Sequence, residues 1–145
     1  MTFTEQKINI FKVPADYYLA HCISGDYTLG AGLAKQMDIE YDLRFNLFML
    51  YPIPNGKKFG FVGKALLVDN VFSLVNKPQC SSKADYTTLE EALKDMKQQC
   101  LKLGIEKIAM SRLACGRDKL DWGKVSQMIQ DIFNDTDIEI IACDM

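Results

Sequence analysis

The most constraining feature of this sequence is an amphipathic helical stretch between two short apolar stretches. Residues 86–104 repeat apolar side chains at helical spacing, and Gly104 is a common helix terminator. Residues 64–76 and 106–113, on either side, have the composition of β-strands. Strands that alternate with helices predict a three-layer α/β domain with a mixed, mostly parallel sheet.

The 86–104 helix is the clearest element. Thr87 or Thr88 is the expected N-cap, and Glu90 or Glu91 lies three residues further on. One apolar stripe is expected to face the core, formed by Leu89, Ala92, Leu93, Met96, Cys100 and Leu103.

Similar patterns predict the other elements. Alternating or apolar runs predict strands at 7–13, 17–23 and 137–144, and two strands within 64–76 that meet at an Asx-type turn, Asp69–Asn70. Helical spacing predicts a helix over 30–50, broken near Asp38, and another over 121–135. A turn-rich loop is expected at 51–60.

Length and composition indicate one globular domain over residues 1–145, with 48% apolar and 25% charged residues. The net charge of −2 argues weakly against nucleic-acid binding through a broad basic face. Neither a signal peptide nor a membrane-spanning run is expected, which predicts a cytoplasmic protein, or a nuclear one if the source is eukaryotic. Five scattered cysteines and one histidine disfavour a zinc site or a disulfide framework. A monomer is expected because no surplus apolar helix face is evident.

Three loops follow predicted strands and are the expected location of a ligand site. They read SGDYTLGAG (24–32), NKPQCSSK (76–83) and LACGRDKLDW (113–122). In open α/β sheets, ligands bind beyond the carboxyl ends of the strands. The first and third loops are glycine-containing turns that lead into helices, which can bind a diphosphate through backbone N–H groups.

The first loop fits neither common nucleotide motif. Gly25 and Gly30 have Walker spacing, but Ala31 and Gly32 follow where Lys and Ser or Thr are needed. The dinucleotide fingerprint fails at Lys35. A tight strand-to-helix connection without a ligand is the alternative interpretation.

Lys77 ends the apolar 71–76 run, just before Pro78. In one interpretation its ammonium group extends into solvent. In the other, a desolvated amine with a pKa below its reference value of about 10.4 attacks an electrophilic carbon such as the anomeric centre of a sugar.

The third loop offers two further candidates. If Asp121 caps the 121–135 helix, Asp118 is free for another role. Cys115 is interpreted as a packed thiol and His21 as a packed, hydrogen-bonded side chain, because no third partner for a Cys–His nucleophile is evident.

Taken together, these segments resemble the macrodomain family, closest to the branch of the human terminal ADP-ribose protein glycohydrolase. The resemblance runs over residues 6–145 and is carried by LAHCIS…GAGLA, LVNK, YTTLEEALKDMKQQCLKLGIEKIAMSRLACGRDKLDW and DTDIEIIA. It implies an α/β/α macrodomain, ADP-ribose as ligand and no cofactor or metal. The implied reaction releases ADP-ribose from modified glutamate or aspartate side chains of proteins, or from O-acyl-ADP-ribose.

The resemblance also implies residue roles. Lys77 attacks the anomeric carbon of the distal ribose and forms a covalent sugar–lysine intermediate, and Asp118 acts as acid and base. The expected ligand-binding residues lie in the three loops and at the ends of their strands: Ser24, Gly30, Ala31, Gly32, Leu33, Asn76, Ser111, Ala114, Cys115, Gly116 and Arg117.

Two alternatives remain open. One is a reader module that binds ADP-ribose without turnover, as many macrodomains do. The other is a hydrolase of ADP-ribosylated nucleic acid, because related macrodomains of toxin–antitoxin systems use a similarly placed lysine for that reaction.

Overall fold

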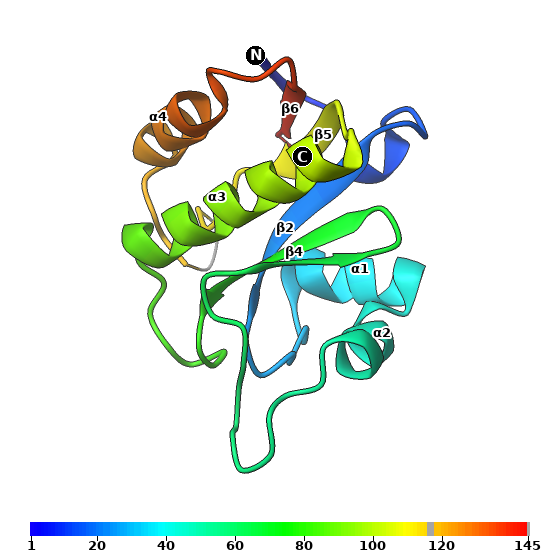
Figure 1. The fold of residues 1–145 in the computed structure, drawn as a ribbon, viewed down its shortest axis with the longest axis vertical. Helices are drawn as coiled ribbons and strands as arrows, with labels where there is room; N and C mark the ends of the chain where they lie inside the picture. The colour runs from blue at the N-terminus through cyan, green and yellow to red at the C-terminus, as the bar shows by residue number, and fades with distance from the viewer. Residues whose placement is uncertain (116–117, 145) are drawn as a thin grey trace.

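A computed structural model describes residues 1–115 and 118–144 (Figure 1). The strands are β1 (Thr2–Gln6), β2 (Tyr18–Ser24), β3 (Ala65–Val68), β4 (Val71–Lys77), β5 (Lys107–Ser111) and β6 (Glu139–Cys143). The helices are α1 (Gly32–Tyr41), α2 (Leu43–Leu50), α3 (Tyr86–Leu103) and α4 (Trp122–Phe133), with a 3-10 turn at Ile10–Lys12.

One mixed sheet organises the fold, in the order β1-β6-β5-β2-β4-β3. All neighbouring strands are parallel except β3 and β4, which form an antiparallel hairpin with Val68 opposite Val71. The hairpin turns at Asp69 and Asn70, as the sequence predicts. The mixed, mostly parallel sheet is therefore confirmed.

Helices cover both faces of the sheet, which gives three layers (Figure 1). Alternating strand residues face opposite sides: Phe72 and Leu74 pack with α3 and α4, whereas Val71 and Val75 pack with α1 and α2. An apolar core thus lies on each face of the sheet, between the sheet and its helices. The sheet is buried on both faces, as is usual for parallel sheets.

The apolar stripe of α3 is confirmed for Leu89, Ala92, Leu93, Met96 and Cys100, which are fully buried. Leu103 is an error in the prediction, because its side chain is 57% exposed at the last helical position. Gly104 ends the helix in the left-handed conformation, as expected.

The N-cap of α3 also differs from the prediction. Asp85, one residue before the helix, accepts a hydrogen bond from the Thr88 backbone N–H at 2.7 Å. Thr87 and Thr88 lie within the helix. Asp121 caps α4 as predicted, accepting from the Lys124 backbone N–H at 3.0 Å.

The N-terminal prediction was wrong. The strand is Thr2–Gln6. Residues 10–12 form a 3-10 turn capped by Asn9. Ile10 of this turn is fully buried in the apolar core on the α1 and α2 side of the sheet. Thr2–Gln6 is a largely exposed edge strand paired with β6, so it carries no apolar pattern by which it could be recognised.

The helical stretch 30–50 breaks at Asp42 rather than near Asp38. Asp42 has a left-handed backbone (φ 50°), which ends α1 and begins α2. Asp38 instead accepts a hydrogen bond from the Arg44 backbone N–H at 2.8 Å and thereby braces the turn.

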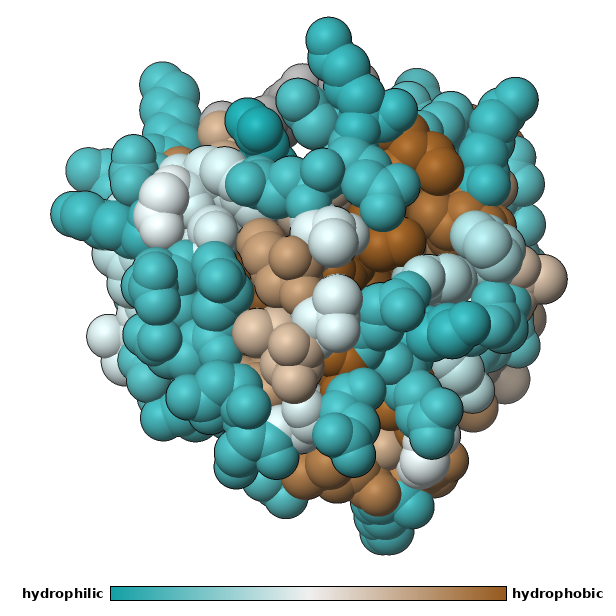
Figure 2. Space-filling model, turned by 90° about the horizontal axis from the view of Figure 1, so that it is seen from above, coloured by the Kyte–Doolittle hydropathy of each residue, from teal (hydrophilic) through white to brown (hydrophobic). Residues whose placement is uncertain are grey.

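The surface is mostly polar, with apolar residues between the hydrophilic ones on the face seen in Figure 2. Exposed apolar side chains do occur on α1, α2 and the segment that follows: Ile39, Phe45, Phe48, Met49, Leu50 and Phe59. The α2 helix therefore does leave apolar side chains exposed, contrary to the sequence-based expectation. Within the described ranges, no helix is both long and apolar enough to cross a bilayer.

Candidate active site

A cavity of about 580 Å³ lies where the carboxyl ends of β2, β4 and β5 meet. These three strands are neighbours in the sheet, so the loops that follow them converge. The cavity is lined by many of the residues expected to bind a ligand: Ser24, Gly30, Ala31, Gly32, Leu33, Asn76, Lys77, Ser111, Ala114 and Asp118.

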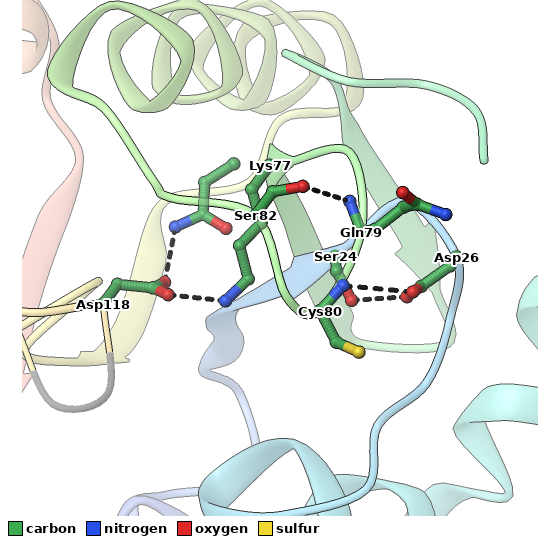
Figure 3. Close-up of polar contacts among 8 residues, drawn as sticks. Ser24, Asp26, Lys77, Gln79, Cys80, Ser82 and Asp118 are labelled. Carbon is green, nitrogen blue, oxygen red and sulfur yellow. Dashed lines mark hydrogen bonds and ion pairs between the residues drawn. The ribbon is translucent and has the colours of Figure 1, made fainter. Parts of the chain in front are cut away.

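Lys77 and Asp118 face each other in this cavity (Figure 3). The Lys77 Nζ lies 2.7 Å from the Asp118 Oδ1, and the side chains are only 15% and 13% exposed. The amine therefore does not extend into bulk solvent. A carboxylate at this distance can accept a proton from the amine, and a neutral amine is a nucleophile.

A β-bulge brings Asn76 to the same carboxylate. Ile23 pairs with Val75 and Ser24 pairs with Lys77, so Asn76 is an extra residue in β4. In a regular strand, successive side chains point to opposite faces. Here Asn76 Nδ2 donates to Asp118 Oδ2 at 2.9 Å while Lys77 reaches Oδ1. Bulges next to active sites commonly re-aim side chains in this way.

The N-terminus of α1 opens into the cavity. Its N-cap is Ala31, whose side chain cannot accept a hydrogen bond, whereas α3 and α4 begin with aspartate caps. The first N–H groups of a helix have no acceptor within the helix. Those of α1 are therefore available to an anion, and the helix dipole favours negative charge at this end.

The β5–α4 loop supplies Asp118 from the other side. Ala114 has a left-handed backbone (φ 58°), and its carbonyl accepts from the Leu120 N–H at 2.8 Å, which closes the loop. Since Asp121 caps α4, Asp118 is left for the cavity.

The structure does not place every expected residue in this cavity. Cys115 lines a neighbouring cavity, which shares Ser111 and Arg112 with the first one. Burial raises the pKa of the Cys115 thiol to about 11, so this cysteine is a neutral thiol at pH 7. Gly116 and Arg117 lie outside the described residues.

Comparison with known proteins identifies the family. The chain is 37% identical to the human ADP-ribose glycohydrolase OARD1 over 94% of its length and 88% of the relative, and 35% identical to the cattle protein over the same shares. The macrodomain of Thermus aquaticus DarG superposes with a TM-score of 0.85 over 99% of both chains at 19% identity. The Mycobacterium tuberculosis DarG macrodomain gives 0.79, again over 99% of both chains at 19% identity. No family model matches the sequence.

The chain belongs to the macrodomain family. Its sequence places it close to the OARD1 branch, as the sequence motifs indicate. The likeness to the DarG macrodomains concerns the fold, since identity there is only 19%.

Asp26 holds two loops of this macrodomain together, a role that no sequence motif indicated. Its Oδ1 accepts from the Ser24 hydroxyl at 2.6 Å and its Oδ2 accepts from the Cys80 N–H at 3.0 Å (Figure 3). Oδ1 also accepts from the Thr28 N–H at 3.2 Å. Partial burial raises the pKa of Asp26, but these hydrogen bonds outweigh that effect and keep the pKa below its usual value.

Gly25 explains why the first loop begins with a glycine. Its N–H donates to the Lys77 carbonyl at 2.9 Å, and its carbonyl accepts from the Gly60 N–H at 3.1 Å. A Cβ at this position would lie 2.7 Å from the Gly60 oxygen and 3.1 Å from the Pro78 oxygen. Gly25 is therefore required for close backbone contact beside Lys77.

His21 lies in the cavity wall and is 1% exposed. Its Nε2 lies 2.7 Å from the Ser73 hydroxyl, whereas its Nδ1 has no hydrogen-bond partner among the described residues. Burial lowers the pKa of His21 from 6.5 to about 3, so the imidazole is neutral at pH 7. This agrees with the interpretation of His21 as a packed, hydrogen-bonded side chain.

The pKa of His21 predicts acid sensitivity of the macrodomain. Between pH 6.5 and 3 the unfolded chain binds a proton at this residue and the folded chain does not, so stability is complete above pH 6.5 and falls below it. The contribution lost at pH 4.5 is about 2–3 kcal/mol. Urea unfolding of wild type and His21→Gln from pH 7 to 4.5 measures this difference. Parallel pH dependences for the two proteins would contradict it.

Proposed function

We propose that this macrodomain hydrolyses the ester that joins ADP-ribose to a glutamate or aspartate side chain, and the related ester of O-acyl-ADP-ribose. The observation that carries the proposal is the Lys77 Nζ to Asp118 Oδ1 contact of 2.7 Å inside the cavity. It is supported by curated relatives named ADP-ribose glycohydrolase and by a solved neighbour, Thermosipho africanus DarTG, described in complex with ADP-ribose.

The binding part of the proposal uses the N-terminus of α1. The diphosphate lies against the N–H groups of Gly32 and Leu33, where a helix with no side-chain cap favours an anion. In this arrangement we expect the distal ribose toward the ends of β4 and β5, where Ser111, Asn76 and Lys77 line the cavity.

The chemical part assigns Lys77 as nucleophile. Asp118 accepts a proton from the Lys77 ammonium, and the neutral amine attacks C1 of the distal ribose. A C–N bond forms and the C–O bond to the acyl group breaks, while Asp118 gives its proton to the departing acyl oxygen, so the acid leaves and Asp118 is ionised again. Asp118 then takes a proton from water, whose oxygen bonds to C1 as the C–N bond breaks. ADP-ribose leaves, and the proton on Asp118 returns to the Lys77 amine.

The substrate class is tested by offering wild-type protein two substrates at equal concentration. One is a protein ADP-ribosylated on glutamate, and the other is DNA ADP-ribosylated on a base. Release of ADP-ribose from the protein, with little from the DNA, is expected. The sugar–lysine adduct opens reversibly to an imine, which borohydride added during turnover should reduce to a stable amine, detectable at Lys77 by mass spectrometry.

Other results of this experiment would support the two alternative functions, a nucleic-acid hydrolase or a reader module. Faster release from DNA would replace the proposed substrate with ADP-ribosylated nucleic acid. Binding of ADP-ribose without release from either substrate would make the chain a reader module. Turnover without any trapped adduct at Lys77 would refute the covalent step.

A further inference from the structure

Asn76 is a buried polar residue of the cavity wall. It lies in the bulge of β4, it is 1% exposed, and its side-chain amide contacts the Asp118 carboxylate, which also faces Lys77. Asn76 Nδ2 donates to Asp118 Oδ2 at 2.9 Å.

The orientation of this amide follows from its partner. An ionised carboxylate only accepts hydrogen bonds, so the group of Asn76 that faces Asp118 has to be the NH₂. The carbonyl oxygen, Oδ1, is thereby left on the other side of the amide. It is buried and has no hydrogen-bond partner among residues 1–115 and 118–144.

A buried oxygen without a partner costs about 1–3 kcal/mol, so native proteins rarely leave one unsatisfied. Asn76 lines the cavity, but neighbouring side chains cover its Oδ1 in the ligand-free structure. A bound molecule can therefore supply the missing donor when these neighbours shift to admit it. Oδ1 only accepts, so it requires a donor such as a hydroxyl and does not favour an ionised phosphate. The position beside Lys77 indicates the sugar whose C1 reacts.

We propose that Asn76 is both a positioning and a specificity residue. Its Nδ2 holds the Asp118 carboxylate toward Lys77, and its Oδ1 accepts a hydrogen bond from a hydroxyl of the distal ribose. The identity of the sugar rests on the proposed function; the orientation of the amide rests on the contact with Asp118 alone.

The binding role is tested by measuring the affinities of ADP-ribose and of ADP, which lacks the distal ribose. Asn76→Ala removes the acceptor and should reduce the preference for ADP-ribose over ADP about five- to tenfold. Asn76→Asp keeps an accepting oxygen, because a carboxyl group facing Asp118 at this distance shares a proton with it and stays in place. This variant should retain the preference within about twofold. Its added charge repels both diphosphates alike, so that effect cancels in the ratio.

The positioning role is tested by turnover. Asn76→Ala removes the donor to Asp118, and Asn76→Asp ties up the Asp118 carboxylate in a shared proton, so kcat should fall about tenfold or more in both. Asn46→Ala is the matched control, because the Asn46 side-chain amide donates to the Tyr41 and Asp42 carbonyls at the α1–α2 turn, and Asn46 is not among the residues that line the cavity. It should retain both the affinity ratio and kcat within about twofold.

An unchanged preference in Asn76→Ala, or loss of affinity for both ligands alike, would overturn the specificity role. An unchanged kcat would overturn the positioning role. If Asn76→Ala does not fold, ADP-ribose lacking one distal hydroxyl should bind wild type about five- to tenfold more weakly than ADP-ribose. If no such deoxy ligand loses affinity, the proposal also fails. A wild type without turnover would refute the proposed function and leave the affinity test of Asn76 valid.

Discussion

Lys77→Ala is expected to reduce release of ADP-ribose from glutamate-linked substrate roughly 10³-fold or more, because the attacking amine is removed. Binding of free ADP-ribose should remain within about fivefold, since the N-terminus of α1 and the hydrogen bond from Asn76 to Asp118 are retained. Turnover is measured with ADP-ribosylated protein, and binding by calorimetry.

Lys83→Ala is the matched control for this prediction. Lys83 is an exposed lysine of the same β4–α3 loop, outside the cavity. It should retain wild-type turnover. Near-normal turnover in Lys77→Ala would refute the role of Lys77 as nucleophile, whereas equal losses of binding and turnover would show that this lysine acts in binding instead.

Asp118→Asn is expected to reduce turnover roughly 10²- to 10⁴-fold, the range typical of a lost general acid–base group. The carboxylate has two accepting oxygens, one for Asn76 and one for Lys77. An amide has only one, so one of the two donors then faces an NH₂ group. The amine also loses the acceptor for its proton, so kcat should fall more than affinity does.

Asp121→Asn makes the same change of carboxylate to amide three residues away. Asn caps a helix about as well as Asp, so α4 should retain its stability and the protein its turnover. A loss of turnover in Asp121→Asn equal to that in Asp118→Asn would indicate that the whole β5–α4 loop had moved. The loss in Asp118→Asn would then not be attributable to its carboxylate.

The elements that could be recognised from the sequence are those defined by a local pattern, such as helical apolar spacing or a capping residue. The stripe of α3 and the Asp121 cap of α4 are local patterns, and the structure confirms them apart from Leu103. β1 was missed because an exposed edge strand is defined by its pairing with β6 and not by alternating apolar residues. The break at Asp42 was misplaced because a left-handed aspartate has no distinctive sequence context.

Some features of the site could likewise be predicted from the sequence, and others could not. The three strand-end loops could be predicted to converge, because strand ends of a parallel sheet lie at one edge. The clamp by Asp26 could not be predicted, since it depends on hydrogen bonds between loops whose separation is set by the sheet.

The sequence by itself determined the alternation of strands and helices beyond residue 17 and the family, because helical periodicity, caps and motifs are properties of neighbouring residues. The resemblance to that family, in turn, suggested Lys77 and Asp118 as a pair. Only the tertiary structure decided that Asn76 and Lys77, successive residues of one strand, both touch a carboxylate 41 residues beyond Lys77. Regular alternation would send the two side chains to opposite faces of the sheet. The bulge that changes this arises from the pairing of β4 with β2, and that register does not exist until the sheet has formed.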